Sequence, residues 1–207
     1  MSQFFSIHPD NPQQRLINNA VEIIQRGGVF ACPTDSGYGL ACRMGDKSAL
    51  DRIRALRQID DKHHMTLVCR DLSELATYAK VNNSAYRMLK NNTPGPYTFI
   101  LEASREVPKR LMHPKKKTVG LRIPSTPIIQ AILAEMGEPL LSSSLILPGE
   151  TEPMPDPWEI RDVLESQLDL VIDGGYCGLV PTTIISLMDD SPEVIREGAG
   201  DITPFVN

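Results

Sequence analysis

The sequence has no long hydrophobic run. None of its apolar stretches approaches the ~18 consecutive apolar residues that a membrane-spanning helix requires. Its N-terminal segment, MSQFFSIHPDNPQQR, also lacks the basic stretch and following apolar core that are typical of an export signal. We therefore expect a cytoplasmic protein that makes no contact with a membrane.

Cysteine is scarce as well. The chain has four cysteines, Cys32, Cys42, Cys69 and Cys177, and no two of them form a CxxC pair. This pattern predicts free thiols in a reducing compartment, and no group of residues shows metal-ligand spacing, so we assign no metal site. A chain of 207 residues is long enough to bury a core without disulfides, and we expect a single domain spanning residues 1–207.

Positive charge is in the minority. The net charge of −5 opposes non-specific binding of the whole molecule to polyanions. The charges are nevertheless unevenly distributed, because residues 105–117 hold six basic groups against one acid, and residues 150–173 hold eight acids against one arginine. The basic segment is either a solvated loop or a local phosphate-binding surface.

Apolar periodicity alternates between helix and strand along the whole chain. Helical spacing predicts helices at 12–26, 46–56, 71–79, 83–91, 127–136 and 158–168, begun by Asn11 with Pro12, Asp46, Ser125 and Asp156. Short β-prone runs predict strands at 29–32, 65–69, 97–101, 118–123, 140–146, 169–172, 182–187 and 193–196. This order predicts an α/β fold with a twisted, open, mixed sheet flanked by helices, in which the last two strands form an antiparallel hairpin.

The stretch at residues 31–42, ACPTDSGYGLAC, interrupts an apolar segment with breaker and polar residues. It is expected to follow a strand and precede a helix, where ligands gather in open α/β sheets. Its two glycines permit close approach of the backbone, and Thr34, Asp35, Ser36 and Tyr38 offer polar groups. The stretch is either a site for a small polar ligand or a tight loop with capping side chains.

Several other strand edges mix breaker and polar residues in the same way. Alternation along a strand would present Ser142 and Ser144 on one face. Arg122, in a β-branched strand, needs an acid or a bound anion as its partner. A surface salt bridge is the alternative for Arg122 and for Arg196.

Seven motifs occur in an order that resembles the YrdC-like family over residues 11–201. They read PTDSGYGL, TPGPYTFIL, VGLRIPS, PLLSSSLILPG, DLVIDGG, PTTIISL and VIREGAG. The sequences SSSLILPG and RQIDDKH resemble the YciO branch of this family. The resemblance implies a concave, electropositive sheet face and an enzyme, acting in tRNA modification, that condenses L-threonine, bicarbonate and ATP, with Mg²⁺, into threonylcarbamoyl-adenylate and pyrophosphate.

The resemblance also implies roles for individual residues. Thr34, Arg122, Ser142 and Thr182 would hold threonine or its carbamate, and Thr118, Ser144 and Arg196 would contact ATP. Arg57 stands where the synthases have a lysine, so Arg57 and Arg196 are the expected catalytic cations. ATP with Mg²⁺ would be bound as substrate, and no tightly held cofactor is expected.

Two departures from the synthase pattern predict weak activity. The family motif Lys-x-Arg is replaced by Arg57-Gln58-Ile59, and Ser-x-Asn is replaced by Ser144-Leu145-Ile146. One lost transition-state donor costs roughly 3–4 kcal/mol, or a hundred- to thousand-fold in rate.

Two other functions therefore stay open. The chain is an alternative candidate for a non-catalytic protein that binds double-stranded RNA or tRNA through Arg54, Lys62, Lys115, Lys116 and Lys117. It is also a candidate for a sensor of a nucleotide or an amino acid.

Overall fold

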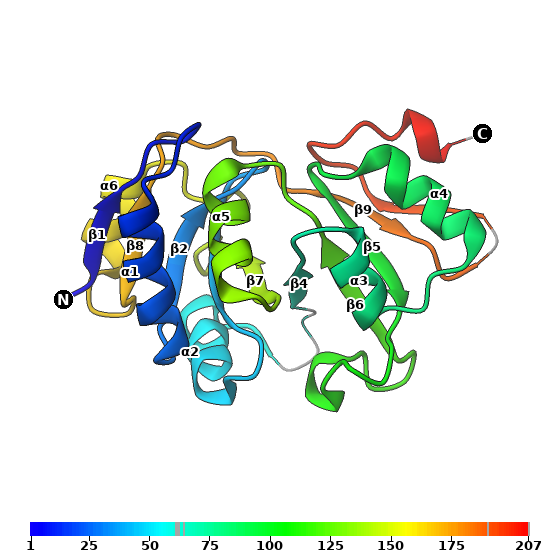
Figure 1. The fold of residues 1–207 in the computed structure, drawn as a ribbon, viewed down its shortest axis with the longest axis horizontal. Helices are drawn as coiled ribbons and strands as arrows, with labels where there is room; N and C mark the ends of the chain where they lie inside the picture. The colour runs from blue at the N-terminus through cyan, green and yellow to red at the C-terminus, as the bar shows by residue number, and fades with distance from the viewer. Residues whose placement is uncertain (61–62, 64, 190, 207) are drawn as a thin grey trace.

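The computed structural model describes residues 1–60, 63, 65–189 and 191–206, and this part of the chain forms one mixed sheet between helices (Figure 1). The ten strands lie in the order β1-β8-β2-β3-β7-β4-β6-β5-β9-β10. Their bounds are β1 Gln3–Ser6, β2 Phe30–Pro33, β3 Tyr38–Arg43, β4 Thr66–Val68, β5 Tyr97–Glu102, β6 Thr118–Arg122, β7 Leu140–Ser144, β8 Leu170–Asp173, β9 Thr183–Ser186 and β10 Glu193–Arg196. Four neighbouring pairs are parallel (β1/β8, β2/β8, β4/β6 and β5/β9), and five are antiparallel, which confirms the predicted mixed sheet.

The helices divide between two hydrophobic clusters. They are α1 Gln14–Gln25, α2 Lys47–Arg57, α3 Leu72–Tyr78, α4 Asn83–Asn92, α5 Pro127–Met136 and α6 Pro157–Leu164, and two short 3₁₀ helices span Lys109–Leu111 and Thr203–Phe205. The apolar stripes of α1 and α5 pack together on β2, β3 and β8, as Figure 1 shows. Helices α2, α3, α4 and α6 contribute to the other cluster. In the described part of the chain, no helix is long and apolar enough to cross a membrane.

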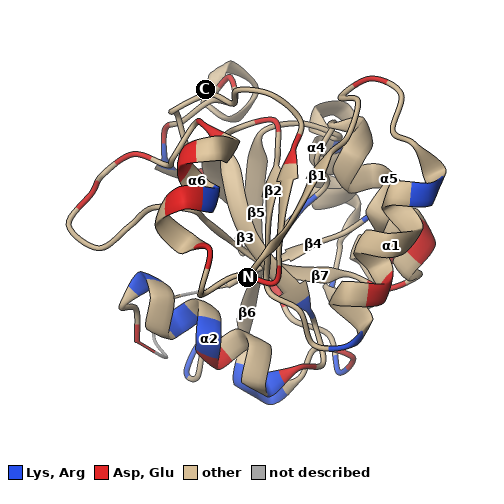
Figure 2. Ribbon diagram, turned by 90° about the vertical axis from the view of Figure 1, so that its left-hand side faces the viewer, with Lys and Arg blue, Asp and Glu red and all other residues tan. Residues whose placement is uncertain are grey.

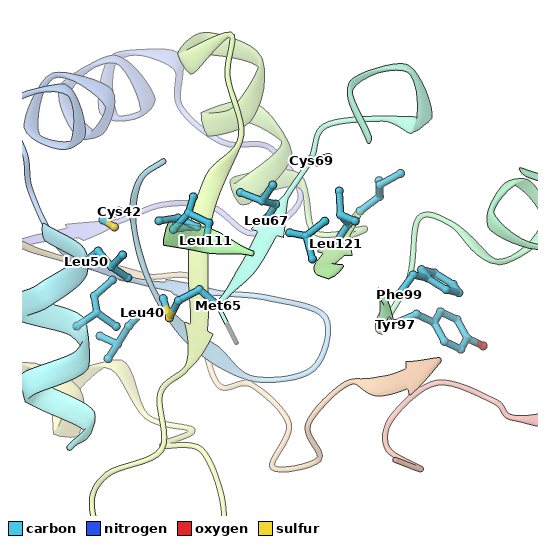
Figure 3. Packing of buried hydrophobic residues seen from close by; sticks show 14 of the residues in the cluster. Leu40, Cys42, Leu50, Met65, Leu67, Cys69, Tyr97, Phe99, Leu111 and Leu121 are labelled. Carbon is cyan, nitrogen blue, oxygen red and sulfur yellow. The ribbon is translucent and has the colours of Figure 1, made fainter. Parts of the chain in front are cut away.

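The larger cluster runs across the middle of the sheet. Leu40 and Cys42 of β3 lie against Leu50 of α2, and Leu67 and Leu121 continue the cluster along β4 and β6 (Figure 3). At its far end, three aromatic rings contact one another with centroids 5.6–6.0 Å apart: Tyr97 and Phe99 stack, and Phe205 meets both of them edge-on. The smaller cluster beneath α1 and α5 includes no residue of β5, β6 or β9. At β5, β6 and β9, therefore, none of the described helices packs on the face of the sheet that α1 and α5 cover elsewhere.

The structure corrects several expectations of local structure. Residues 38–43 form β3, because their apolar side chains pair with β2 and β7, so the ACPTDSGYGLAC stretch is a β-hairpin rather than a strand-to-helix connection. Helix α1 begins at Gln14 with Gln13 as its N-cap, two residues later than Pro12. Thr126 takes the N-cap of α5, because Ser125 binds Asp35 instead. Strand β1 was not predicted, because a four-residue edge strand is too short for a clear periodicity.

Other local predictions are confirmed. Strands β9 and β10 form the expected antiparallel hairpin. Asp156 caps α6, and its carboxylate accepts a hydrogen bond from the Trp158 N–H at 2.9 Å. The predicted cap at Asp46 is also present, because Oδ1 accepts a hydrogen bond from the Ala49 N–H at 2.9 Å.

Replacing Asp46 with alanine is expected to lower the free energy of unfolding by about 1 kcal/mol. The substitution leaves a first-turn N–H of α2 without its side-chain acceptor, while Asp46→Asn keeps an acceptor oxygen in the same place. Urea denaturation followed by circular dichroism measures both variants. Equal losses of stability in the two variants would show that the cap hydrogen bond is not what Asp46 contributes.

Candidate functional site

The turn between β2 and β3 forms the centre of the candidate site. Thr34 directly follows β2, and its Oγ1 donates a hydrogen bond to the Gly37 carbonyl at 2.6 Å. The same oxygen accepts from the Ser36 N–H at 3.3 Å, and the Thr34 N–H donates to the Gly37 carbonyl at 3.1 Å. These contacts fix the turn, so Thr34 is held at the edge of the sheet at the carboxyl end of β2.

Two adjoining cavities open beside this turn. Both are lined by Thr34, Gly39, Arg122 and Ser142. The first continues over apolar side chains (Cys32, Ala41, Val68, Pro124 and Ile129), and the second over Ser36, Gly37, Tyr38, Ser144, Pro153 and Pro181. A Cβ atom at Gly39 would lie 3.1 Å from Ser142 Oγ, so glycine keeps the shared floor of the cavities free.

Arg122 is the charged group of these cavities. Its Nη2 forms an ion pair with Asp35 Oδ1, and the side chains are only 8% and 9% exposed. Asp35 Oδ2 accepts from the N–H and the hydroxyl of Ser125, at 2.9 and 3.1 Å. The Nε atom of Arg122 is buried and has no hydrogen-bond partner among the described residues. Burial lowers the pKa of this guanidinium and Asp35 opposes the shift, so Arg122 stays a cation with unused donor capacity.

Two segments lie against the β2–β3 hairpin, one at Pro153 and one at residues 174–178. A Cβ atom at Gly37 would lie 3.0 Å from both the Gly178 carbonyl oxygen and Pro153 Cγ, so both segments approach the bare backbone of the turn. The Tyr38 hydroxyl donates to the Gly175 carbonyl at 2.8 Å and accepts from the Gly174 N–H at 3.3 Å. Burial raises the pKa of this phenol, so it stays protonated and can donate. Pro153 is therefore buried against the site.

Thr182 and Arg196 lie next to the second cavity. The Thr182 hydroxyl shares a hydrogen bond of 3.0 Å with the hydroxyl of Thr98 on β5. Arg196, on β10, donates from Nε and Nη2 to the Thr182 carbonyl at 3.2 and 2.7 Å. Thr98 also lies against β6, because a Cβ atom at Gly120 would be 3.4 Å from Thr98 Cγ2. Thr98 therefore connects Thr182 to β6. Desolvation lowers the pKa of Arg196.

Alternation along β7 separates the three serines as predicted. Ser142 and Ser144 both line the second cavity. Ser143 accepts a hydrogen bond from Arg57 Nη1, and Arg57 Nε donates to the Ile146 carbonyl at 3.2 Å. Arg57 therefore reaches β7 from α2 and is not among the residues that line either cavity. Desolvation lowers the pKa of Arg57.

The remaining predicted residues lie outside the cavities. Thr118 begins β6 and is buried, on the same face as Gly120 and Arg122. Lys115, Lys116 and Lys117 are exposed in the turn before β6, and Arg54 is half-buried on α2, 3.8 Å from Asp51. Lys62 lies outside the described residues. Figure 2 shows Lys and Arg residues along the ribbon of α2.

Sequence reasoning missed three features of the site. It offered Asp35 as a polar group for a ligand and did not identify it as the acid that Arg122 needs, because these residues are 87 positions apart in the chain. It did not find that Gly39 forms the cavity floor, and it did not find that Tyr38 anchors residues 174–175. Tyr38 and Gly39 could have been noticed in the YGL segment, but their roles follow only once residues 38–43 are known to form a strand.

The described cysteines are free, and their chemistry is restrained by burial. Burial raises the pKa of the Cys32 thiol, and it raises that of Cys177 to about 11. Neither side chain is therefore a thiolate near neutral pH. No group of three His, Cys, Asp or Glu side chains able to hold a metal ion occurs within the described ranges.

Comparison with known proteins adds a family match. A family model covering Sua5, YciO and YrdC proteins, described as telomere recombination, matches residues 22–198. The uncharacterized protein YciO of Escherichia coli K12 is 61% identical over 206 residues, covering 100% of both chains. The threonylcarbamoyl-AMP synthase of Vibrio vulnificus YJ016 is 28% identical over 161 residues, covering 76% of this chain and 86% of its own.

Solved structures share the same fold. The crystal structure of E. coli YciO superposes with a TM-score of 0.96 at 61% identity and covers 100% of both chains. The crystal structure of P. abyssi Sua5 complexed with L-threonine has a TM-score of 0.87 at 24% identity, covering 95% of this chain and 58% of its own. The sheet order and the flanking helices are therefore those of these proteins.

Proposed function

This chain belongs to the Sua5/YciO/YrdC family, and from that membership we propose that it binds L-threonine beside ATP and forms a threonine-derived carbamoyl-adenylate. Threonylcarbamoyl-AMP synthases are among its more distant relatives. The product would serve the modification of tRNA. The proposal assigns the cavities beside Thr34, together with Thr182, to the amino acid, and the neighbouring Ser144 and Arg196 to the nucleotide.

Arg122 carries the amino-acid part of the proposal. It is a buried cation whose Nε lacks a partner among the described residues, and it lines both cavities beside hydroxyl groups. A carboxylate is the ligand that satisfies such a guanidinium best. P. abyssi Sua5, which has this fold, has been solved with L-threonine.

The nucleotide part rests on the cations next to the cavities. Arg196 is held against Thr182 by two hydrogen bonds, while Ser144 brings a hydroxyl to the cavity wall. Arginine side chains and hydroxyls stabilise the charge that builds on phosphoryl oxygens during transfer. Because no acidic cluster for a resident metal occurs in the described part of the chain, we propose that Mg²⁺ arrives with ATP as part of the substrate.

The proposed chemistry needs no nucleophile from the protein. The amine of threonine adds to the carbon of bicarbonate, and loss of water leaves the carbamate. An oxygen of this carbamate attacks the α-phosphorus of ATP, the bond to the β-phosphate oxygen breaks, and pyrophosphate leaves. The side chains orient the reactants and stabilise charge, which agrees with the absence of a thiolate among the described cysteines.

The rate is expected to be low. Ile59 and Ile146 stand where the synthase motifs have a cation and an amide. Arg57 donates to the Ile146 carbonyl, while Ile59 packs against the larger hydrophobic cluster. Arg57 thus supplies one cation next to Ile146, and the second cation and the amide of the synthase motifs are replaced by isoleucines.

Pyrophosphate release by the purified protein tests the proposal. With threonine, bicarbonate, ATP and Mg²⁺, we expect release that stops when either threonine or bicarbonate is omitted, and a threonylcarbamoyl-adenylate product that mass spectrometry detects. Serine in place of threonine and heat-denatured protein are the controls. Release equal to that of the denatured protein would refute the proposal.

RNA binding without turnover is the second candidate. It is supported by the exposed Lys115, Lys116 and Lys117 and by the basic residues along α2 (Figure 2). If it is correct, binding of double-stranded RNA or tRNA should weaken steeply with salt, because phosphate contacts release counterions. Lys115→Glu with Lys116→Glu should reduce binding. The control Lys80→Glu, which changes a lysine outside this surface, should not. Binding that ignores both salt and the paired substitution would exclude this surface.

A further inference from the structure

Strand β1 is the end strand of the sheet that the described residues form, and none of the described strands pairs with its outer edge. The N–H groups of Gln3 and Ile7 donate to the carbonyls of Asp169 and Asp173, at 2.9 and 2.8 Å, on the β8 side. Because backbone groups alternate along a strand, the N–H and C=O groups of Phe4 and Ser6 point the other way. No backbone group of the described residues bonds to them there. The strand therefore presents unpaired donors and acceptors at the end of the sheet, which faces the viewer in Figure 2.

The two ends of the sheet differ in how they resist pairing. Strand β10, at the other end, carries Glu193 and Arg196 and has a register irregularity between Val194 and Arg196. Charges and bulges on an edge strand discourage the addition of another strand. The sequence of β1, Gln-Phe-Phe-Ser, has neither a charge nor a bulge. Only one end of the sheet is thus left ready to pair.

An exposed aromatic platform adjoins β1. The rings of Phe4 and Trp158 of α6 are in contact in a tilted arrangement with centroids 4.4 Å apart, and the Arg161 guanidinium lies over both rings. Trp158 is 54% exposed, and Tyr176, whose hydroxyl donates to the Asp156 carboxylate at 3.0 Å, is 78% exposed. Trp, Tyr and Arg are the side chains that contribute most to protein interfaces. Exposure of this size at a free strand edge is typical of a docking surface rather than of a solvated helix.

The charge of this surface indicates what it accepts. Residues 150–173 hold eight acids against Arg161, and Figure 2 shows acidic residues on α6. Glu159 and Asp162 are exposed on the same helix as Trp158. A basic partner complements this surface. A second copy of this chain does not, because antiparallel pairing of two β1 strands puts the acidic α6 helices of both copies on the same side of the joined sheet.

We propose that the β1 edge, flanked by Phe4, Trp158 and the acids of α6, is a docking site for an extended basic segment of another protein. The segment adds to the sheet beside β1 through main-chain hydrogen bonds to Phe4 and Ser6. Its apolar side chains cover Trp158, and its lysine or arginine side chains lie next to Glu159 and Asp162. This site is independent of the cavities at Arg122 and of the reaction proposed for them.

A synthetic peptide of alternating lysine and valine tests the site. Trp158 is the only tryptophan of the chain, so its fluorescence reports on the platform directly. We expect saturable binding of the lysine–valine peptide. An alternating glutamate–valine peptide and a lysine–valine peptide N-methylated on alternate backbone nitrogens should each bind at least about tenfold more weakly, because one lacks charge complementarity and the other cannot form the ladder.

Two variants test the strand edge itself. Ser6→Pro removes the outward N–H and is expected to weaken the lysine–valine peptide at least about tenfold, while the matched Ser6→Ala should not. Glu159→Gln with Asp162→Asn should weaken it and reduce its salt dependence. The N-methylated peptide on the unaltered protein decides the question even if Ser6→Pro does not fold. Equal affinity for all three peptides, no binding of the lysine–valine peptide, or a dimer in sedimentation that Ser6→Pro dissociates would overturn the proposal.

Discussion

Replacing Arg122 with methionine is expected to lower the free energy of unfolding by about 3–5 kcal/mol and to weaken threonine binding by roughly 30-fold or more. The stability loss follows because Asp35, 9% exposed, would keep its charge without its cationic partner. Its hydrogen bonds from the N–H and hydroxyl of Ser125 would remain, which sets the loss toward the lower end of this range. The affinity loss follows because the carboxylate of the amino acid would lose its proposed guanidinium.

The double variant Asp35→Asn with Arg122→Met separates these two effects. It removes both charges, so most of the lost stability should return, while threonine binding should stay weak. Urea denaturation gives the stability, and isothermal titration calorimetry gives the affinity. Asp35→Asn alone is the matched control, because it keeps the guanidinium and an acceptor for Ser125. Unchanged threonine affinity in the folded double variant would remove Arg122 from the proposed site.

Restoring the synthase motif is expected to raise the rate of pyrophosphate release by as much as a hundred- to thousand-fold, which is roughly the effect of one transition-state donor. The variant is Ile59→Arg with Ile146→Asn. The new amide at position 146 would extend from a backbone that Arg57 Nε already contacts, at 3.2 Å from the Ile146 carbonyl oxygen. The new guanidinium would lie two positions along the chain from Arg57. The new amide and the new guanidinium would therefore add to the cation that Arg57 already provides.

Apolar substitutions at the same positions are the controls. Ile146→Leu and Ile59→Val should leave the rate unchanged. Because Ile59 packs against the larger hydrophobic cluster, the thermal midpoint of each variant has to be measured with its rate. A folded Ile146→Asn protein that is no faster than the unaltered one, alone or with Ile59→Arg, would show that the weak activity has another origin.

Local pattern was sufficient for most of the fold. The carboxylates of Asp46 and Asp156 begin helices because each is followed by apolar residues at helical spacing, and caps depend only on near neighbours. The alternation of Ser142 and Ser144 was also readable, because side-chain direction in a strand reverses at every residue. Residues 38–43 were not readable in this way, since their small and apolar side chains fit a buried strand or a loop equally well.

The sequence by itself determined the α/β class, the mixed sheet, the family and the residues that carry its motifs. Only the tertiary structure decided that Arg122 pairs with Asp35, that Arg57 reaches Ser143 from α2, and that Pro153 and Gly178 close over the hairpin. The physical reason is range. Periodicity, capping and side-chain alternation act over a few residues, whereas the site joins segments as distant in the chain as Tyr38 and Gly175, which are 137 positions apart. Their meeting depends on how the whole sheet pairs and twists.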